Sequence, residues 1–166
     1  VVDLPQYAPS TAEADAAVAE MKERLAQVQA EVAAGSRPAY ELPGAQAMAA
    51  WARDYRAAAG APAPPCPLEM QALRIGDVAL IATAGETFTE VGQRLKQALP
   101  LPRSVALGYS NGCVGYIPTE AAFSQGGYEV EVAYRYYGTL MLTPDCERLI
   151  LAAGRRLAAD VAARGV

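Results

Sequence analysis

A proline-rich segment, Ala61-Pro-Ala-Pro-Pro65, divides this 166-residue chain into two parts with different hydrophobic patterns. Proline fixes the backbone torsion φ and lacks an amide hydrogen, so three prolines in five residues favour a stiff, extended connector. Before this segment apolar residues recur at helical spacing, and after it they alternate or form continuous runs, as in strands. We therefore predict two domains, residues 1–65 and residues 66–166.

The first domain is predicted to be a helical hairpin followed by the connector. Residues 10–34 form an amphipathic helix that begins with a capping box of Ser10 and Glu13 and ends at Gly35. Its apolar face carries Val18, Met21, Leu25, Val28 and Val32. Residues 44–59 form the second helix, which a short loop joins to the first. The apolar side of this helix carries Met48, Trp51 and Tyr55.

The second domain is predicted to alternate strands and helices. Residues 69–76 alternate in polarity, residues 77–84 form an apolar run typical of a buried strand, and Gly76-Asp77 favours a hairpin turn between them. Thr87 and Glu90 predict a second capping box, which opens a helix to about Leu99. The later elements are a strand at 104–109, an extended piece at 115–118, and helices at 119–123 and 144–164.

The order of these elements predicts an α/β fold, with α+β as the alternative. We expect a layered sheet with flanking helices, preceded by the helical hairpin. Residues 128–138 remain ambiguous between strand and irregular structure. A hydrophobic content of 52% indicates a chain that buries a core rather than a disordered one.

Charge and hydropathy exclude several classes of protein. A formal net charge of −4 argues against binding to a nucleic-acid backbone, which normally requires a basic surface. No apolar run approaches the roughly 18 residues of a transmembrane helix. Residues 1–9 lack the basic start and apolar core of a signal peptide. We therefore expect a soluble chain without a membrane span, in a compartment that the sequence does not reveal.

The chain contains no histidine. It cannot by itself build a Ser-His-Asp or Cys-His catalytic group, or a His-ligated zinc site. Either the absence is chance in an Ala-rich chain, or the His-bearing part lies elsewhere. The first residue is Val1 rather than Met, which we interpret as a processed N-terminus or as a piece of a longer protein. The three cysteines, Cys66, Cys113 and Cys146, are widely spaced and are interpreted as small structural residues.

Polar residues follow two of the predicted strands. Glu86 comes directly after the apolar run, at the sheet edge where α/β proteins place their sites, and it can bind a metal or serve as a solvated charge at a helix start. The strand at 104–109 leads into a glycine-rich loop with Ser110 and Asn111, which suits close approach to a ligand or a tight turn. The tyrosines near residues 128–137 are more typical of a core or an interface.

Three of these segments together resemble the neutral/alkaline non-lysosomal ceramidase family. They are Leu73–Gly92, which closes in Ala-Gly-Glu86; Gly108–Thr119, with Gly-Tyr-Ser-Asn111 and Gly-Tyr116; and Glu120–Glu129, which ends in Tyr128-Glu129. Order, spacing and residue types agree over about residues 68–150. Ala84 and Cys113 depart from the family, which often has Pro at the first position and an aromatic residue at the second.

The resemblance implies a zinc-dependent amide hydrolase. Glu86 and Tyr116 match the family's carboxylate and tyrosine zinc ligands, and Tyr128 matches a tyrosine that stabilises the oxyanion. Ser110 and Asn111 match a loop that is a candidate for substrate contact. Zinc in such a site polarises the amide carbonyl and lowers the pKa of a bound water. The implied substrate is ceramide or a related N-acyl amide lipid.

The family's remaining zinc ligands are histidines in an earlier part of the chain, and its serine-bearing substrate motif also lies earlier. We therefore expect residues 66–166 to be the C-terminal part of a larger ceramidase-like catalytic domain, of the shorter bacterial branch without the Ig-like domain. The expected partner is the N-terminal part of the same protein or a separate His-bearing chain. The alternative is a non-catalytic binding or structural domain that kept the scaffold and lost the site.

Overall fold

The computed structural model describes residues 1–163, and the chain forms two compact units. One unit is Tyr7–Ala63; the other joins Val1–Gln6 to the chain from Pro64 onward. The first residues belong to the second unit because strand β1 (Val2–Leu4) pairs antiparallel with β2 (Cys66–Leu68). The sequence pattern does not reveal β1, since three residues are too few to show a periodic pattern. The helical hairpin is therefore inserted between two paired strands rather than placed ahead of the sheet domain.

The helical unit consists of α1 (Thr11–Ala33), the 3₁₀ turn η1 (Ala39–Glu41) and α2 (Leu42–Ala57), and the predicted hairpin is confirmed. The capping box at the start of α1 is present, because the Glu13 amide donates to Ser10 Oγ at 3.2 Å and the Ser10 amide donates to Glu13 Oε2 at 2.9 Å. The hydrogen bonds from Ser10 lower the pKa of the Glu13 carboxyl.

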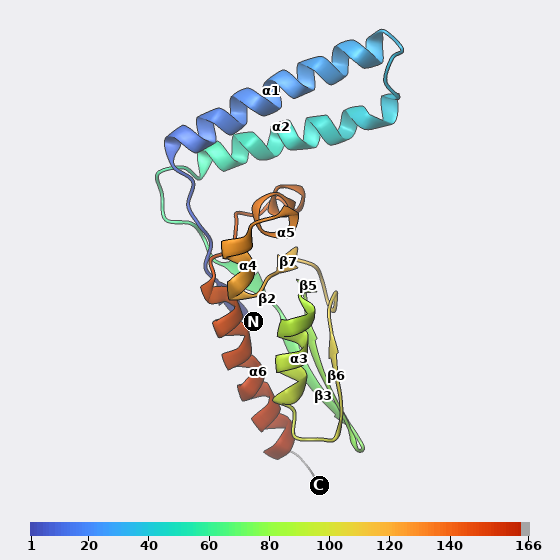
Figure 1. The fold of residues 1–166 in the computed structure, drawn as a ribbon, viewed down its shortest axis with the longest axis vertical. Helices are drawn as coiled ribbons and strands as arrows, with labels where there is room; N and C mark the ends of the chain where they lie inside the picture. Colours follow the sequence, from blue (N-terminus) through green and yellow to red (C-terminus); the bar gives the residue numbers. More distant parts are fainter. Residues whose placement is uncertain (164–166) are drawn as a thin grey trace. The chain divides into compact units, whose positions relative to one another are not determined.

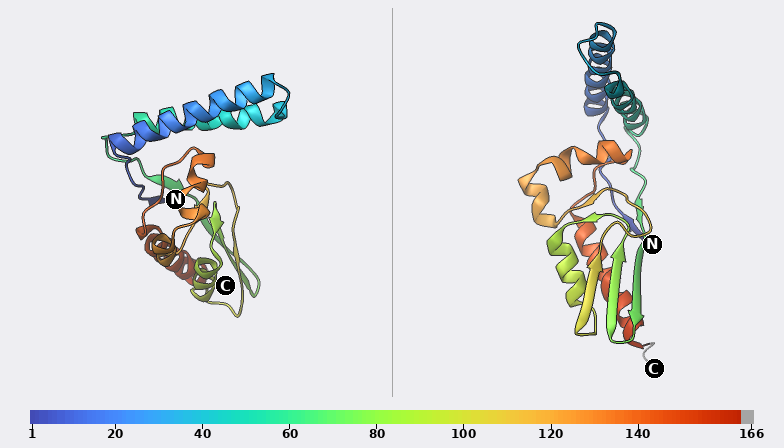
Figure 2. Two further views of the ribbon diagram at one scale, coloured as in Figure 1. Left: turned by 45° about the horizontal axis from the view of Figure 1, so that its top comes forward. Right: turned by 90° about the vertical axis from the view of Figure 1, so that its right-hand side faces the viewer.

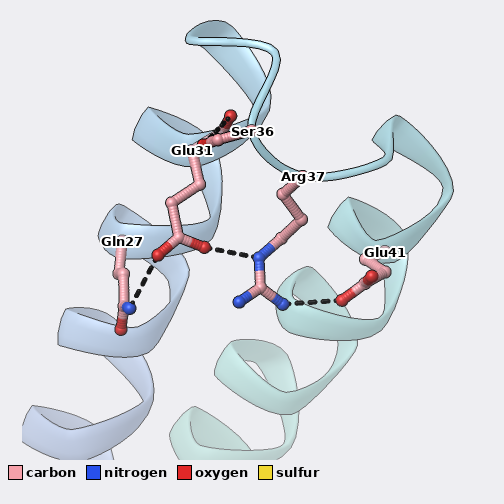
Figure 3. Close-up of polar contacts among 5 residues, drawn as sticks. All are labelled: Gln27, Glu31, Ser36, Arg37 and Glu41. Atoms are coloured by element: carbon pink, nitrogen blue, oxygen red, sulfur yellow. Dashed lines mark hydrogen bonds and ion pairs between the residues drawn. The ribbon is translucent and has the colours of Figure 1, made fainter.

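Arg37 links the two helices through ion pairs at their connecting loop. Arg37 Nε lies 2.5 Å from Glu31 Oε2, and Arg37 Nη1 lies 2.6 Å from Glu41 Oε2 (Figure 3). Gln27 Nε2 also donates to Glu31 Oε1, at 2.8 Å. The hydrogen bond from Gln27, followed by that from Arg37, lowers the pKa of Glu31. The Arg37 side chain thus bridges the end of α1 and the start of α2.

The other unit is built on a three-stranded sheet in the order β3-β4-β6, which confirms the α/β class. Strands β3 (Met70–Ile75) and β4 (Val78–Thr83) form an antiparallel hairpin around Gly76, whose φ is +61°. Helix α3 (Thr89–Gln97) then crosses over to β6 (Arg103–Leu107), which runs parallel to β4. Because β4 and β6 are parallel, their carboxyl ends meet at one edge of the sheet.

Helix α3 and the final helix α6 (Asp145–Ala163) lie side by side on one face of this sheet (Figures 1 and 2). The buried face of β4 carries Ala79, Ile81 and Thr83 and forms the centre of the core. The opposite face keeps apolar side chains exposed: Leu73, Ile75, Val105 and Leu107. The apolar run at 77–84 is thus a strand that buries one of its faces, not both.

Shorter elements lie above the carboxyl edge of the sheet. Strands β5 (Glu86–Thr87) and β7 (Tyr116–Ile117) pair in parallel, and α4 (Glu120–Gln125) follows with Thr119 as its N-cap. Residues 128–138, ambiguous in sequence, are helical: α5 (Tyr128–Glu131) and the 3₁₀ helix η2 (Ala133–Tyr137). The expected end of the last helix, residue 164, lies outside the described residues.

The predicted capping box of Thr87 and Glu90 is wrong. Thr87 belongs to β5, its hydroxyl lies 2.6 Å from that of Thr83, and the N-cap of α3 is Phe88, with no side-chain cap. Strand pairing explains the difference, because the Phe88 amide donates to the Ile117 carbonyl at 3.0 Å. A pairing with a distant segment therefore overrides the local helix-start signal.

A buried carboxylate fixes α3, α4 and α6 to one another. Glu147 on α6 is buried, forms an ion pair with Arg94 on α3, and accepts a hydrogen bond from the Glu120 amide at 2.7 Å. The Glu120 amide lies at the first turn of α4, where backbone donors lack helical partners. One side chain thus satisfies both an arginine and a helix start, and it positions the segment that leads to α5.

Two glycines in the helices of this unit give a matched test of the packing. A Cβ at Gly154 of α6 would lie 2.4 Å from Leu95 Cδ2, whereas a Cβ at Gly92 of α3 would meet only Ala106 Cβ, at 3.8 Å. We expect Gly154→Ala to lower the free energy of unfolding by about 1–3 kcal/mol through overpacking. Gly92→Ala should be neutral or raise it by up to about 1 kcal/mol, through helix propensity. Urea unfolding followed by circular dichroism measures both; equal stability of the two variants contradicts this packing.

Candidate functional site around Glu86

The candidate site begins where β4 ends and the chain continues into β5. Glu86 pairs with Tyr116 across the parallel β5–β7 ladder, and the Glu86 amide donates to the Gly115 carbonyl at 2.8 Å. Two residues implied to act together are therefore neighbours on adjacent strands. Glu86 lies at the sheet edge expected from the sequence, at the carboxyl end of β4.

The loop after β6 folds back onto the end of β4 through backbone hydrogen bonds. The Tyr109 amide donates to the Gly85 carbonyl at 2.9 Å, and the Val114 amide donates to the Ala84 carbonyl at 2.9 Å. Glycine at position 108 suits this close approach, because a Cβ there would lie 3.0 Å from the Gly85 carbonyl oxygen, and glycine at position 85 leaves room for β7, because a Cβ there would lie 2.5 Å from Ile117 Cδ1. The loop after β6 and the end of β4 therefore form a closely packed backbone segment next to Glu86, called the platform.

Tyrosine hydroxyls surround the Glu86 carboxylate. Tyr109 donates to Oε2 and Tyr137 donates to Oε1, so each carboxylate oxygen has its own phenol. A hydrogen bond to Glu86 also raises the pKa of Tyr116. The hydrogen bond to Glu86 raises the pKa of Tyr109 to about 12. The negative carboxylate favours the protonated phenols and disfavours their phenolates.

Tyr128 joins this group through ring contacts. Its ring lies edge-on to that of Tyr116, with centroids 6.2 Å apart and planes at 77°, and it lies 6.4 Å from the ring of Tyr136. Phe88 contacts the other side of Tyr116, with ring centroids 6.4 Å apart. Tyr128 is 50% exposed, so the residue is partly open to solvent.

An open pocket lies at this edge of the unit. Its lining comprises Glu86, Thr87, Phe88, Thr89, Glu90, Gly108, Tyr109 and Tyr116. Tyr128 is connected to the pocket through its ring contact with Tyr116. The structure thus brings together Glu86, Tyr116 and Tyr128, which come from three separate motifs.

The two loop residues Ser110 and Asn111 point elsewhere. Asn111 Nδ2 donates to Glu69 Oε1 at 2.8 Å and to Gln71 Oε1 at 3.2 Å, so its side chain faces the β3 edge. Ser110 Oγ donates to the Gly108 carbonyl at 3.1 Å, within the loop itself. These contacts give both residues a structural role in the loop and bring neither side chain to the Glu86 carboxylate.

Sequence reasoning missed Tyr109 and Tyr137. Tyr109 lay inside the motif of the glycine-rich loop, but its spacing does not reveal that its hydroxyl reaches Glu86. Tyr137 belonged to a tyrosine cluster interpreted as core or interface, and it is 51 residues from Glu86 in sequence. The available signal was the concentration of tyrosines within the second motif and within and after the third motif.

The resemblance of the motifs implies that Glu86 and Tyr116 are zinc ligands. Zinc accepts carboxylate oxygen as a ligand, but a closed tetrahedral site needs four ligands, usually including nitrogen or sulfur. Glu86 and Tyr116 offer two oxygen donors on adjacent strands. Across residues 1–163, no group of three or more His, Cys, Asp or Glu side chains is arranged to hold a metal ion. The described residues by themselves therefore do not form a closed zinc site.

The three cysteines lie in different environments, and all are free thiols. Cys66 and Cys146 are buried, which raises the pKa of both thiols, that of Cys146 to about 12. Cys113 is exposed in the loop after β6.

Within the described part of the chain, no helix has the length and apolar content needed to cross a membrane.

Comparisons with known proteins find a distant structural likeness to a ceramidase. The chain matches no protein-family model and none of the curated proteins with which it was compared. Among solved structures it is similar to neutral ceramidase from Pseudomonas aeruginosa, with 22% identity and a TM-score of 0.46. The match covers 63% of this chain but only 16% of that ceramidase. At these values the likeness carries no functional inference, so the proposal below depends on the motifs and on the geometry around Glu86.

The raised pKa of Tyr109 gives a pH prediction. Its folded pKa, about 12, exceeds the ordinary value of 10, so the stabilisation from its hydrogen bond is fully present below pH 10 and is lost as the pH rises toward 12. Glu86→Gln should return the Tyr109 titration toward its ordinary range. Carbon-13 NMR of the tyrosine Cζ atoms follows each phenol separately, with Tyr40, exposed in η1, as the internal control. A Tyr109 midpoint near 10 in the unmodified chain would contradict the hydrogen bond.

Proposed function

We propose that this chain supplies the carboxylate and tyrosine part of a zinc-dependent amide hydrolase site that resembles that of neutral ceramidases. The observation that carries the proposal is convergence. Glu86, Tyr116 and Tyr128 belong to three separate segments of the ceramidase-like sequence, and all three lie in one continuous group at the carboxyl edge of the sheet.

In the proposed site the Glu86 carboxylate and the Tyr116 phenol oxygen would hold zinc. When bound, the metal would polarise the carbonyl of the substrate amide and lower the pKa of a bound water. Tyr128 donates its hydroxyl proton in a hydrogen bond to the negative charge that develops on the amide oxygen. Its exposed position beside Tyr116 suits that task, because the substrate carbonyl must approach from solvent.

The proposed site requires further ligands from outside this chain. A partner segment bearing histidines, either earlier in the same protein or on a separate chain, would complete the tetrahedral set. The proposed substrate class is an N-acyl amide, ceramide or a related lipid. That class follows from the resemblance of the motifs rather than from a groove seen in the structure.

A second candidate function is a non-catalytic binding or structural domain. The observation that favours it is the saturation of Glu86: both carboxylate oxygens already accept phenol hydroxyls. A carboxylate satisfied in this way is stable without a metal. The absence of histidine from the chain agrees with that role. The two functions differ in whether Glu86 responds to zinc when imidazole ligands are supplied.

The 166-residue chain alone should not bind zinc tightly and should show no amidase activity, because two oxygen ligands cannot close a tetrahedral site. Competition with a zinc-sensitive dye measures the affinity. A dissociation constant in the nanomolar range for the isolated chain would contradict this expectation.

The decisive experiment is to determine the coding sequence upstream of Val1 and to express the chain with any in-frame segment that carries paired histidines. Hydrolysis of a fluorogenic N-acyl amide should then depend on zinc. Glu86→Gln should reduce the rate by more than the roughly 10–100-fold typical of residues that only orient a ligand. Glu23→Gln, on the exposed side of α1, is the matched control and should retain the rate. Equal activity of the two variants would refute the proposal.

A further inference from the structure

We infer that Tyr109 and Tyr137 are positioning residues, whose two hydroxyls hold the Glu86 carboxylate in a single orientation. The resemblance to the ceramidase family assigns no role to either tyrosine. The purpose of that orientation, to present Glu86 to a metal, rests on the proposed function. The hydrogen-bonded arrangement itself can be tested without any metal.

Tyr109 reaches Glu86 because its backbone adopts an uncommon conformation. Its φ is +53°, in the left-handed region that residues other than glycine seldom occupy. The hydrogen bond from its amide to the Gly85 carbonyl holds this conformation. The side chain is 66% exposed, so core packing does not explain its direction. Its hydrogen bond to Glu86 Oε2 is the specific contact that the conformation makes.

Tyr137 reaches the same carboxylate from a different element. It is the last residue of η2, and the left-handed Gly138, with φ +67°, turns the chain directly after it. Its ring packs on Gly115, where a Cβ would lie 2.9 Å from the Tyr137 Cδ2 atom. Gly115 thus leaves room for the ring, which directs the hydroxyl to Glu86 Oε1.

The two contacts together restrict the carboxylate more than either one would alone. A glutamate side chain at an open pocket has several rotatable bonds and would otherwise sample many rotamers. Two donors, 23 and 51 residues away in sequence, act on different oxygens and fix both the position and the plane of the group. Each ionised oxygen has about two acceptor sites, so one hydrogen bond leaves room for a further ligand. Hydrogen bonds to a ligating carboxylate commonly serve this purpose in metal sites.

The test uses the full chain labelled with carbon-13 at the glutamate carboxyl carbon, with Glu86 assigned from the resonance missing in Glu86→Gln. Tyr109→Phe and Tyr137→Phe each keep the ring and remove one hydroxyl. Tyr136→Phe is the matched control, since its ring contacts Tyr128 rather than Glu86. We expect both test variants to shift the Glu86 resonance and leave the other glutamates in place, and the double variant to shift it further. The control should leave it unchanged.

A titration with zinc chloride in the presence of imidazole, which supplies the missing nitrogen ligands, then tests the purpose of the arrangement. The unmodified chain should show a zinc-dependent Glu86 shift, and its midpoint should move to about tenfold higher zinc in Tyr137→Phe. A Glu86 resonance that is the same in both Phe variants as in the unmodified chain would overturn the inference. So would a shift of equal size in Tyr136→Phe. A Glu86 resonance that moves in the Phe variants but never responds to zinc even with imidazole present supports the positioning and counts against the proposed function.

Discussion

The backbone hydrogen bonds between the end of β4 and the loop after β6 are the constraint on which the candidate site depends. The carbonyls of Ala84 and Gly85 accept from Val114 and Tyr109, which places the loop directly against the strand end. Glycine at position 108 suits this approach, because a Cβ there would lie 3.0 Å from the Gly85 carbonyl oxygen. Without this platform neither the pairing of Glu86 with Tyr116 nor the direction of Tyr109 would follow.

The tyrosines around Glu86 form one electrostatic unit. Neutral phenols donate to a single carboxylate, and the carboxylate in return raises the pKa of Tyr109 and Tyr116 and keeps them protonated. This arrangement satisfies the charge in the isolated chain and also holds it in a fixed orientation. The same contacts therefore suit a structural carboxylate and a metal ligand awaiting further donors. The response of Glu86 to zinc separates these two roles, because only a metal ligand would bind zinc.

Most of the regular elements could be predicted because their signals are local. The Ser10–Glu13 capping box, the hairpin turn at Gly76 and the helix after Pro144 depend on residues close in sequence, and all three are present. The capping box at Thr87 failed because β5 pairs with β7, about thirty positions further along. Strand β1 was missed because its partner lies beyond the whole helical hairpin. Pairing between distant segments leaves little trace in local periodicity.

By itself, the sequence determined the two hydrophobic patterns on either side of Pro65, the absence of imidazole, and the residue types available at the sheet edge. Those properties depend on composition and short spacing. The tertiary structure alone decided that Asn111 turns toward β3 and that Tyr109 and Tyr137 converge on Glu86. Side-chain direction depends on backbone torsions such as the positive φ of Tyr109, and on contacts across tens of residues. Only the folded chain supplies these, because the strand pairing that creates them is not local.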